Sequence, residues 1–234
     1  FSGVIPNLNN INRIFSMKKL FQDKYFGLLI GLLLAYLVLF FTLDFASESS
    51  LFADQPRHII HCALDDLIPF NEWFAIPYFI WFLAFPGSLL FFLLLDKRDF
   101  IDLCLVVFGG AVFCFAVYLL WPNGLQLRPE PAELNDNLLC RLLQLVWLVD
   151  APNNVCPSLH VSISCAIGLV TWRSSRLKPY LGLRLAVAGL MLLICISTVF
   201  VKQHSVLDVA AGILLSSILY LLIKEVVNRG QSRY

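Results

Sequence analysis

Six apolar stretches, each about 20 residues long, take up most of this 234-residue chain. A helix needs about 20 consecutive apolar residues to cross the hydrocarbon core of a bilayer. Backbone polar groups find no water there, so such segments must fold as helices. The stretches lie at about 25–43, 73–95, 100–121, 155–172, 183–201 and 205–227. The sequence therefore predicts an all-α integral membrane six-helix bundle, formed by one membrane domain at 25–227.

The composition supports a membrane protein. Hydrophobic residues make up 59% of the chain and charged residues 14%, against about 45–50% and about 25% in soluble domains. The net charge of +1 says nothing about partners, because the charges are sorted by loop. We expect membrane lipids as partners and no nucleic acid, and the sequence leaves the oligomeric state open.

The basic residues predict the orientation, because Lys and Arg concentrate in cytoplasmic loops. With the amino terminus in the cytoplasm, 13 of the 17 Lys and Arg residues fall inside. The four that fall outside are Arg57, Arg128, Arg141 and Lys202. We therefore expect a cell membrane protein with both termini cytoplasmic, including an amino-terminal segment 1–24 and a tail 228–234.

This topology places several chemically active residues at one depth, on the extracytoplasmic face. Arg128 follows the third span, Ser158 and His160 open the fourth, and Lys202 and His204 lie between the fifth and sixth. Ionisable residues are costly at bilayer depth and mark functional sites. His204 and Asp208 are four residues apart, so they share one helical face, where the carboxylate can hold one imidazole nitrogen and leave the other free.

These residue types suit phosphoryl transfer, which needs positive groups around the phosphate, a nucleophile and a proton donor. Arg128 offers a planar fork of donors for phosphate oxygens. Ser158 follows Pro157 at a helix amino terminus, which favours an anion. Asp208 would orient His204 for attack on phosphorus, and His160 would protonate the leaving oxygen and then activate water. We expect no metal and no cofactor.

Arg128-Pro129 resembles the end of the first signature motif of the type 2 phosphatidic acid phosphatase superfamily. Pro157-Ser158-x-His160 and Ser197-x6-His204-x3-Asp208 resemble its second and third motifs, in this order. The resemblance covers roughly residues 73–227. It implies a six-helix bundle without metal. It also implies the same residue roles: phosphate binding by Arg128 and Ser158, His160 as acid, His204 as nucleophile and Asp208 as orienter.

Two positions depart from the family pattern. Trp121 stands where the first motif begins with Lys, and Thr198 stands where the third motif has Arg. Lys202 is the best replacement for the missing phosphate-binding cations, since a flexible ammonium can reach a pocket from a helix end. The arrangement is similar to a branch that includes relatives of sphingomyelin and inositol phosphorylceramide synthases.

The sequence thus predicts a lipid phosphatase that hydrolyses a phosphomonoester or pyrophosphate through a phosphohistidine intermediate at the extracytoplasmic face. Two alternatives remain: a lipid phosphotransferase, and a non-catalytic transporter or scaffold for anionic lipids. The residues 138–149 form an amphipathic segment, expected at the outer interface as a lid or gate. His58, His61, Asp65 and Asp66 have spacing compatible with zinc, although a loop lying on the membrane is the preferred interpretation.

Overall fold

The computed structural model describes residues 23–48 and 57–231, and it is all-helical apart from one short strand pair. The predicted segments 1–24 and 228–234 fall mainly or partly outside these residues. The long helices are α3 (Lys24–Glu48), α5 (Ala75–Leu95), α6 (Lys97–Leu120), α9 (Leu181–Phe200) and α10 (Val206–Gln231). The shorter elements are β1 (His58–Ile59), α4 (Ala63–Leu67), η1 (Glu72–Phe74), β2 (Asn123–Gly124), η2 (Pro131–Glu133), α7 (Leu138–Val149) and α8 (Leu159–Arg173).

Five of these helices are long and apolar enough to cross a membrane, as a multi-pass membrane protein requires. The fourth predicted span, 155–172, contains a shorter helix than expected. Its helix α8 begins only at Leu159, because residues 151–158 form a loop that ends in the helix cap Ser158. At 1.5 Å per residue, its 15 residues reach only about 22 Å.

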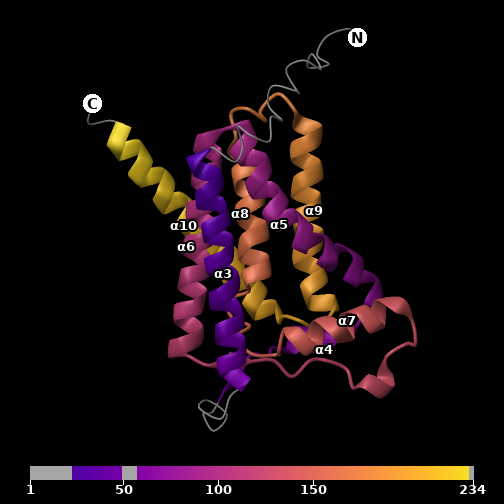
Figure 1. Cartoon of the computed structure of the whole chain (residues 1–234). Helices are drawn as coiled ribbons and strands as arrows, with labels where there is room; N and C mark the ends of the chain where they lie inside the picture. The colour runs from indigo at the N-terminus through magenta and orange to yellow at the C-terminus, as the bar shows by residue number, and fades with distance from the viewer. Residues whose placement is uncertain (1–22, 49–56, 232–234) are drawn as a thin grey trace.

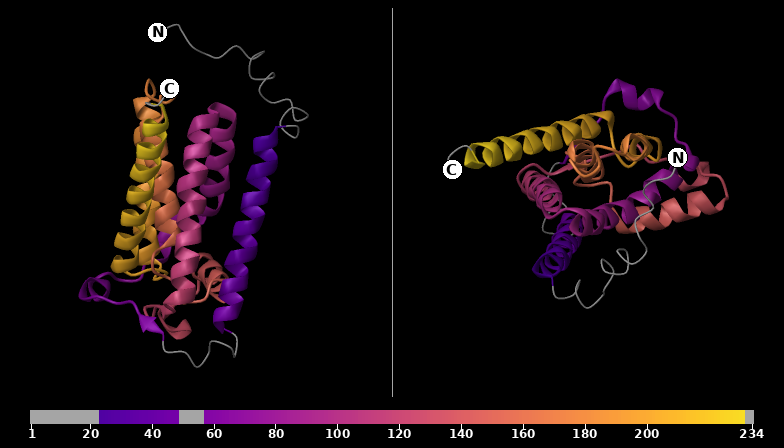
Figure 2. Two further views of the ribbon diagram at one scale, coloured as in Figure 1. Left: turned by 90° about the vertical axis from the view of Figure 1, so that its left-hand side faces the viewer. Right: turned by 90° about the horizontal axis from the view of Figure 1, so that it is seen from above.

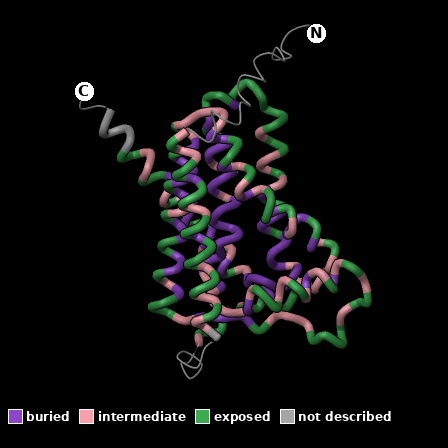
Figure 3. The backbone as a smooth tube through the Cα atoms, in the orientation of Figure 1, coloured by how far each residue is buried: buried purple, intermediate pink, exposed green. Residues whose placement is uncertain are grey.

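Helix α8 is nevertheless the centre of the bundle. It packs against α6, α9 and α10, and most of its residues are buried. Figure 3 shows the buried residues gathered along the inner faces of the helices, while the outward faces are largely exposed. Helix α3 stands at the edge of the bundle and packs against α5 and α6 (Figure 2). Exposed apolar side chains around a buried central helix are compatible with contact between the outer surface of the bundle and lipid.

The two ends of the bundle differ in character. The start of α3 and the end of α10 lie at one end, and α4 and α7 lie at the other, with α7 running across the long helices (Figure 1). The first end carries ion pairs between Asp102 and Lys224 and between Asp96 and Arg176. The second end carries the loops that hold the candidate site.

Candidate active site

His204 and Asp208 form a hydrogen-bonded pair at the start of α10. His204 lies in a tight turn after α9, where its N–H donates to the carbonyl of Thr198. Its Nδ1 is 3.0 Å from Asp208 Oδ2, which also accepts from the N–H of Ser205 at 2.9 Å. Asp208 is fully buried. A carboxylate in this position fixes the proton on Nδ1 and leaves the Nε2 lone pair free to react.

The free nitrogen of His204 faces His160. His160 Nδ1 is 3.4 Å from His204 Nε2, and the two rings come from separate segments, α8 and the turn before α10. On its other side, His160 packs against Trp81 and Tyr78, with ring centroids 4.2 and 5.0 Å away. The second ring nitrogen of His160 has no hydrogen-bond partner among the described residues. Two imidazoles are thus fixed side by side, as a nucleophile and a proton donor for one phosphorus centre require.

A close approach between α8 and α10 brings these histidines together. Gly212 faces the first turn of α8, and a Cβ there would lie 2.8 Å from the carbonyl oxygen of Ser158. The N–H of Ser158 donates to the carbonyl of Asp208 at 3.2 Å. Only a residue without a side chain allows this contact. No sequence motif marks Gly212, and its one signal is its place one helical turn after Asp208.

Ser158 caps helix α8. Its Oγ accepts from the N–H of Val161 at 3.2 Å, and the residue is fully buried. Tyr118 supports the preceding turn by donating to the carbonyl of Pro157 at 2.6 Å. His160 is the second residue of α8, so the amino-terminal end of this helix lies at the candidate site, where an anion benefits from the helix dipole.

Arg128 lies near the site, but both of its terminal nitrogens donate to protein oxygens, and its Nε has no partner among the described residues. The guanidinium donates to the carbonyl oxygens of Trp147 and Asp150 at 3.3 and 2.6 Å, and to the side-chain oxygen of Gln203. Burial lowers the pKa of Arg128, and the charge of Asp150 opposes this shift. Gln203 precedes His204, so Arg128 acts on the site through Gln203 rather than by lining the cavity.

Lys202 points away from the cavity. Its ammonium is buried and donates to the carbonyl oxygens of Asp65, at 3.0 Å, and Ile68. Lys202 also has a left-handed backbone, with φ of 58°. Its predicted part in binding phosphate therefore has no support in this geometry, because the ammonium instead holds α4 and the residue that follows it.

Asp65 completes the clamp on the loop that carries His204. Its carboxylate accepts from Ser205 Oγ at 2.6 Å and from the N–H groups of Val206 and Cys62, each at 2.8 Å. Burial raises the pKa of Asp65, but these hydrogen bonds outweigh it and hold the pKa below its usual value. The first loop thus fixes the start of α10, a link that no sequence motif announces.

The four residues of the possible zinc motif do not converge. His61 Nε2 pairs with Asp66 at 2.8 Å, whereas the Asp65 carboxylate faces α10. His58 stacks on Trp121 with ring centroids 5.2 Å apart. Among residues 23–48 and 57–231, no group of three or more His, Cys, Asp or Glu side chains gathers as metal ligands would. All seven cysteines are free thiols.

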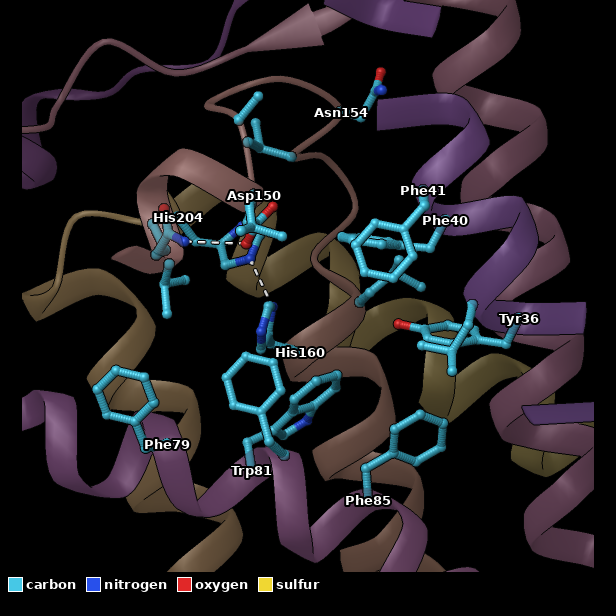
Figure 4. A pocket seen from close by; sticks show the side chains of 18 of the residues that line it. Tyr36, Phe40, Phe41, Phe79, Trp81, Phe85, Asp150, Asn154, His160 and His204 are labelled. Atoms are coloured by element: carbon cyan, nitrogen blue, oxygen red, sulfur yellow. Dashed lines mark hydrogen bonds between the residues drawn. The ribbon is translucent and has the colours of Figure 1, made fainter. Parts of the chain in front are cut away.

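A cavity of about 620 Å³ opens beside the two histidines. Asp150, His160 and His204 lie at one side of it, and Tyr36, Phe40, Phe41 and Phe85 lie at the other (Figure 4). Helices α3, α5 and α7 supply most of its wall, which is mainly aromatic and aliphatic. Its polar lining residues are Asp150, Asn153, Asn154, His160, Gln203 and His204. Such a cavity accommodates a ligand with a small polar group and a long apolar part.

Gln203, Asp150 and Tyr78 form a polar cluster that the sequence analysis missed. Gln203 Nε2 donates to Asp150 Oδ2 at 3.0 Å and contacts the Tyr78 hydroxyl at 3.2 Å. Burial raises the pKa of Asp150, and the charge of Arg128 works in the opposite direction. None of the three residues belongs to a recognisable motif, and they come from three separate segments.

Comparison with known proteins does not assign the chain to a family. No family model matches it, and no curated protein or solved structure gives a significant match.

Proposed function

We propose that this protein cleaves a phosphoester of a membrane lipid, without a metal ion, through a phosphohistidine formed on His204. One observation carries the proposal: the Asp208-held imidazole of His204 presents its free nitrogen to His160 beside an apolar cavity. A polar pair with a merely structural role has no need of a second histidine at its free nitrogen.

The reaction has two steps. In the first, His204 Nε2 attacks phosphorus while His160, in its protonated form, gives a proton to the departing oxygen. The imidazole ring gains positive charge as the bond to phosphorus forms, and the buried carboxylate of Asp208 stabilises that charge. In the second step, His160 takes a proton from the acceptor as the acceptor oxygen displaces His204 from phosphorus. The amino terminus of α8 supplies backbone donors to the phosphate oxygens.

The apolar side of the cavity supports a lipid substrate. Its wall between α3 and α5 includes Leu33, Tyr36, Phe40 and Phe85. The outward face of α3, which supplies part of this wall, carries exposed apolar side chains. We propose that the acyl chain occupies this side, while α7 covers the headgroup as a lid at the outer interface. The proposed topology has six spans, including the short α8, with both termini cytoplasmic and the site at the extracytoplasmic face.

Cleavage of a panel of lipid phosphates by detergent-purified protein, in the presence of EDTA, tests the proposal. The products measured are inorganic phosphate from a monoester or pyrophosphate, and an alcohol with a phosphomonoester from a diester. The panel includes a phosphomonoester, a pyrophosphate and a phosphodiester with matched tails. We expect activity that persists in EDTA and is abolished by His204→Ala without loss of folded protein. Labelled phosphate trapped on the wild-type protein should be acid-labile and base-stable. Substantial turnover by His204→Ala would refute the mechanism.

Lipid phosphotransfer is a second candidate, because the first step is the same and only the acceptor differs. The apolar cavity beside the histidines favours this candidate, because it gives a lipid alcohol as well as water a route to the phosphohistidine. Adding a long-chain alcohol to the assay separates the two outcomes, since a transferase forms a new lipid phosphoester instead of free phosphate. A binding scaffold is disfavoured, because no Lys or Arg lines the described part of the cavity, and anion binding alone would use such cations.

A further inference from the structure

The charges around the cavity differ from those that a doubly charged phosphate requires. Among its described lining residues, Asp150 is the one carboxylate, and none is Lys or Arg. The cations that lie nearby donate to protein oxygens, and the Nε of Arg128 is the one of their groups that is buried without a partner among the described residues. Arg128 and Lys202 donate as described above, and Arg57 donates to Asn153 Oδ1 at 2.7 Å. Asp150 and Arg128 together leave the site without a net positive charge.

The Asp150 carboxylate is held toward the cavity and is not paired with the guanidinium of Arg128. Arg128 donates to the backbone carbonyl of Asp150, whereas the carboxylate takes its hydrogen bond from Gln203. Because Gln203 immediately precedes His204, this hydrogen bond fixes the carboxylate beside the nucleophile. Figure 4 shows Asp150 next to His204, on the same side of the cavity as His160.

A fixed carboxylate at this place acts on the charge of the substrate. A phosphomonoester carries a charge of about −1.5 to −2 at pH 7, whereas a phosphodiester carries a single negative charge. Two unit charges about 6 Å apart, at an effective dielectric constant of about 20, interact strongly enough to change binding by roughly a hundredfold. The additional charge of the monoester therefore meets a penalty that the diester avoids.

We propose that Asp150 is a specificity-determining residue that makes the cavity take a lipid phosphodiester in preference to a dianionic lipid phosphomonoester. The inference rests on the proposed function and narrows its substrate class. It also replaces the monoester or pyrophosphate predicted from the sequence with a singly charged phosphoryl donor.

Two lipids with identical acyl chains test the preference: phosphatidylglycerol as the diester and phosphatidate as the monoester, each in mixed micelles. We expect wild-type kcat/KM to be at least about tenfold higher for phosphatidylglycerol. Asp150→Asn keeps an oxygen for Gln203 and removes the charge, so it should reduce this preference at least about tenfold by improving phosphatidate turnover. Asp136→Asn is the matched control, since Asp136 is an exposed acid that pairs with Arg141 outside the cavity, and it should change nothing.

Equilibrium binding to the non-reactive His204→Ala protein gives a reading that needs no catalysis. This protein should bind phosphatidylglycerol more tightly than phosphatidate, and the double variant with Asp150→Asn should bind them about equally. Equal binding by His204→Ala, a wild-type preference for phosphatidate, or an unchanged preference in Asp150→Asn would each overturn the assignment. If neither lipid is cleaved, the proposed function fails, and the binding result alone decides the role of Asp150.

Discussion

Replacing Asp208 with Asn separates a catalytic role of this carboxylate from a structural one. The side chain is fully buried, its Oδ2 accepts from His204 and Ser205, and its Oδ1 has no partner among the described residues. Asn retains the shape and one accepting oxygen but cannot balance the positive charge that the His204 ring gains during attack. Losing such a carboxylate costs about 10⁴-fold in kcat in hydrolytic triads, or about 5.4 kcal/mol.

The stability of the protein should change far less. The substitution weakens two charge-assisted hydrogen bonds, but it also removes a buried charge with one unpaired oxygen, and these effects oppose each other. We expect the free energy of unfolding to change by less than about 1.5 kcal/mol. Thermal unfolding in detergent and single-turnover kinetics on a lipid substrate measure the two quantities in one preparation.

Asp102 provides the control, because it is also a buried aspartate but pairs with Lys224 at the opposite end of the bundle. Asp102→Asn should lower the free energy of unfolding by roughly 1–3 kcal/mol, since it leaves the ammonium without its partner. The activity of the folded fraction should stay near that of wild type. If folded Asp208→Asn keeps more than about a tenth of wild-type kcat, Asp208 is not the orienting group that we propose.

Three further changes test how the site is built. Lys202→Met should lower the free energy of unfolding by about 1–3 kcal/mol, since it removes charged donors from two carbonyl oxygens. The loss of activity that follows from reduced stability should be the same for every substrate. If Lys202 instead bound phosphate, its replacement would lower the rate about 10²–10³-fold with little change in stability. Gly212→Ala should push α10 away from Ser158 and abolish activity, even at temperatures at which the variant remains folded. A folded variant with wild-type activity would contradict this expectation. In a cysteine-free protein, Asp136→Cys should react with an impermeant maleimide on intact cells and Ser175→Cys only after permeabilisation, and the opposite pattern would reverse the topology.

The sequence by itself determined the class of fold, because the length and spacing of apolar runs leave few alternatives in a bilayer. Helices α3, α5, α6, α9 and α10 appear within a few residues of the predicted spans. The amphipathic stretch at 138–149 is also a helix with the predicted bounds. The helix α8 was the exception, since its start depends on a loop and a cap rather than on hydrophobicity.

The spacing of four residues between His204 and Asp208 predicted their pairing, because that contact is local in the chain. For His204 and His160 the sequence predicted only that they lie at the same depth in the membrane. The packing of α8 on α10 at Gly212 determines the distance between them.

Tertiary structure alone decided where the long charged side chains point. Lys202 is held by carbonyl oxygens more than 130 positions earlier in the chain, and no local pattern records such a contact. Asp150 and Gln203 likewise meet only because the end of α7 folds over the turn before α10. Helices follow from local periodicity, but the direction of a flexible side chain follows from partners that only the folded bundle brings within reach.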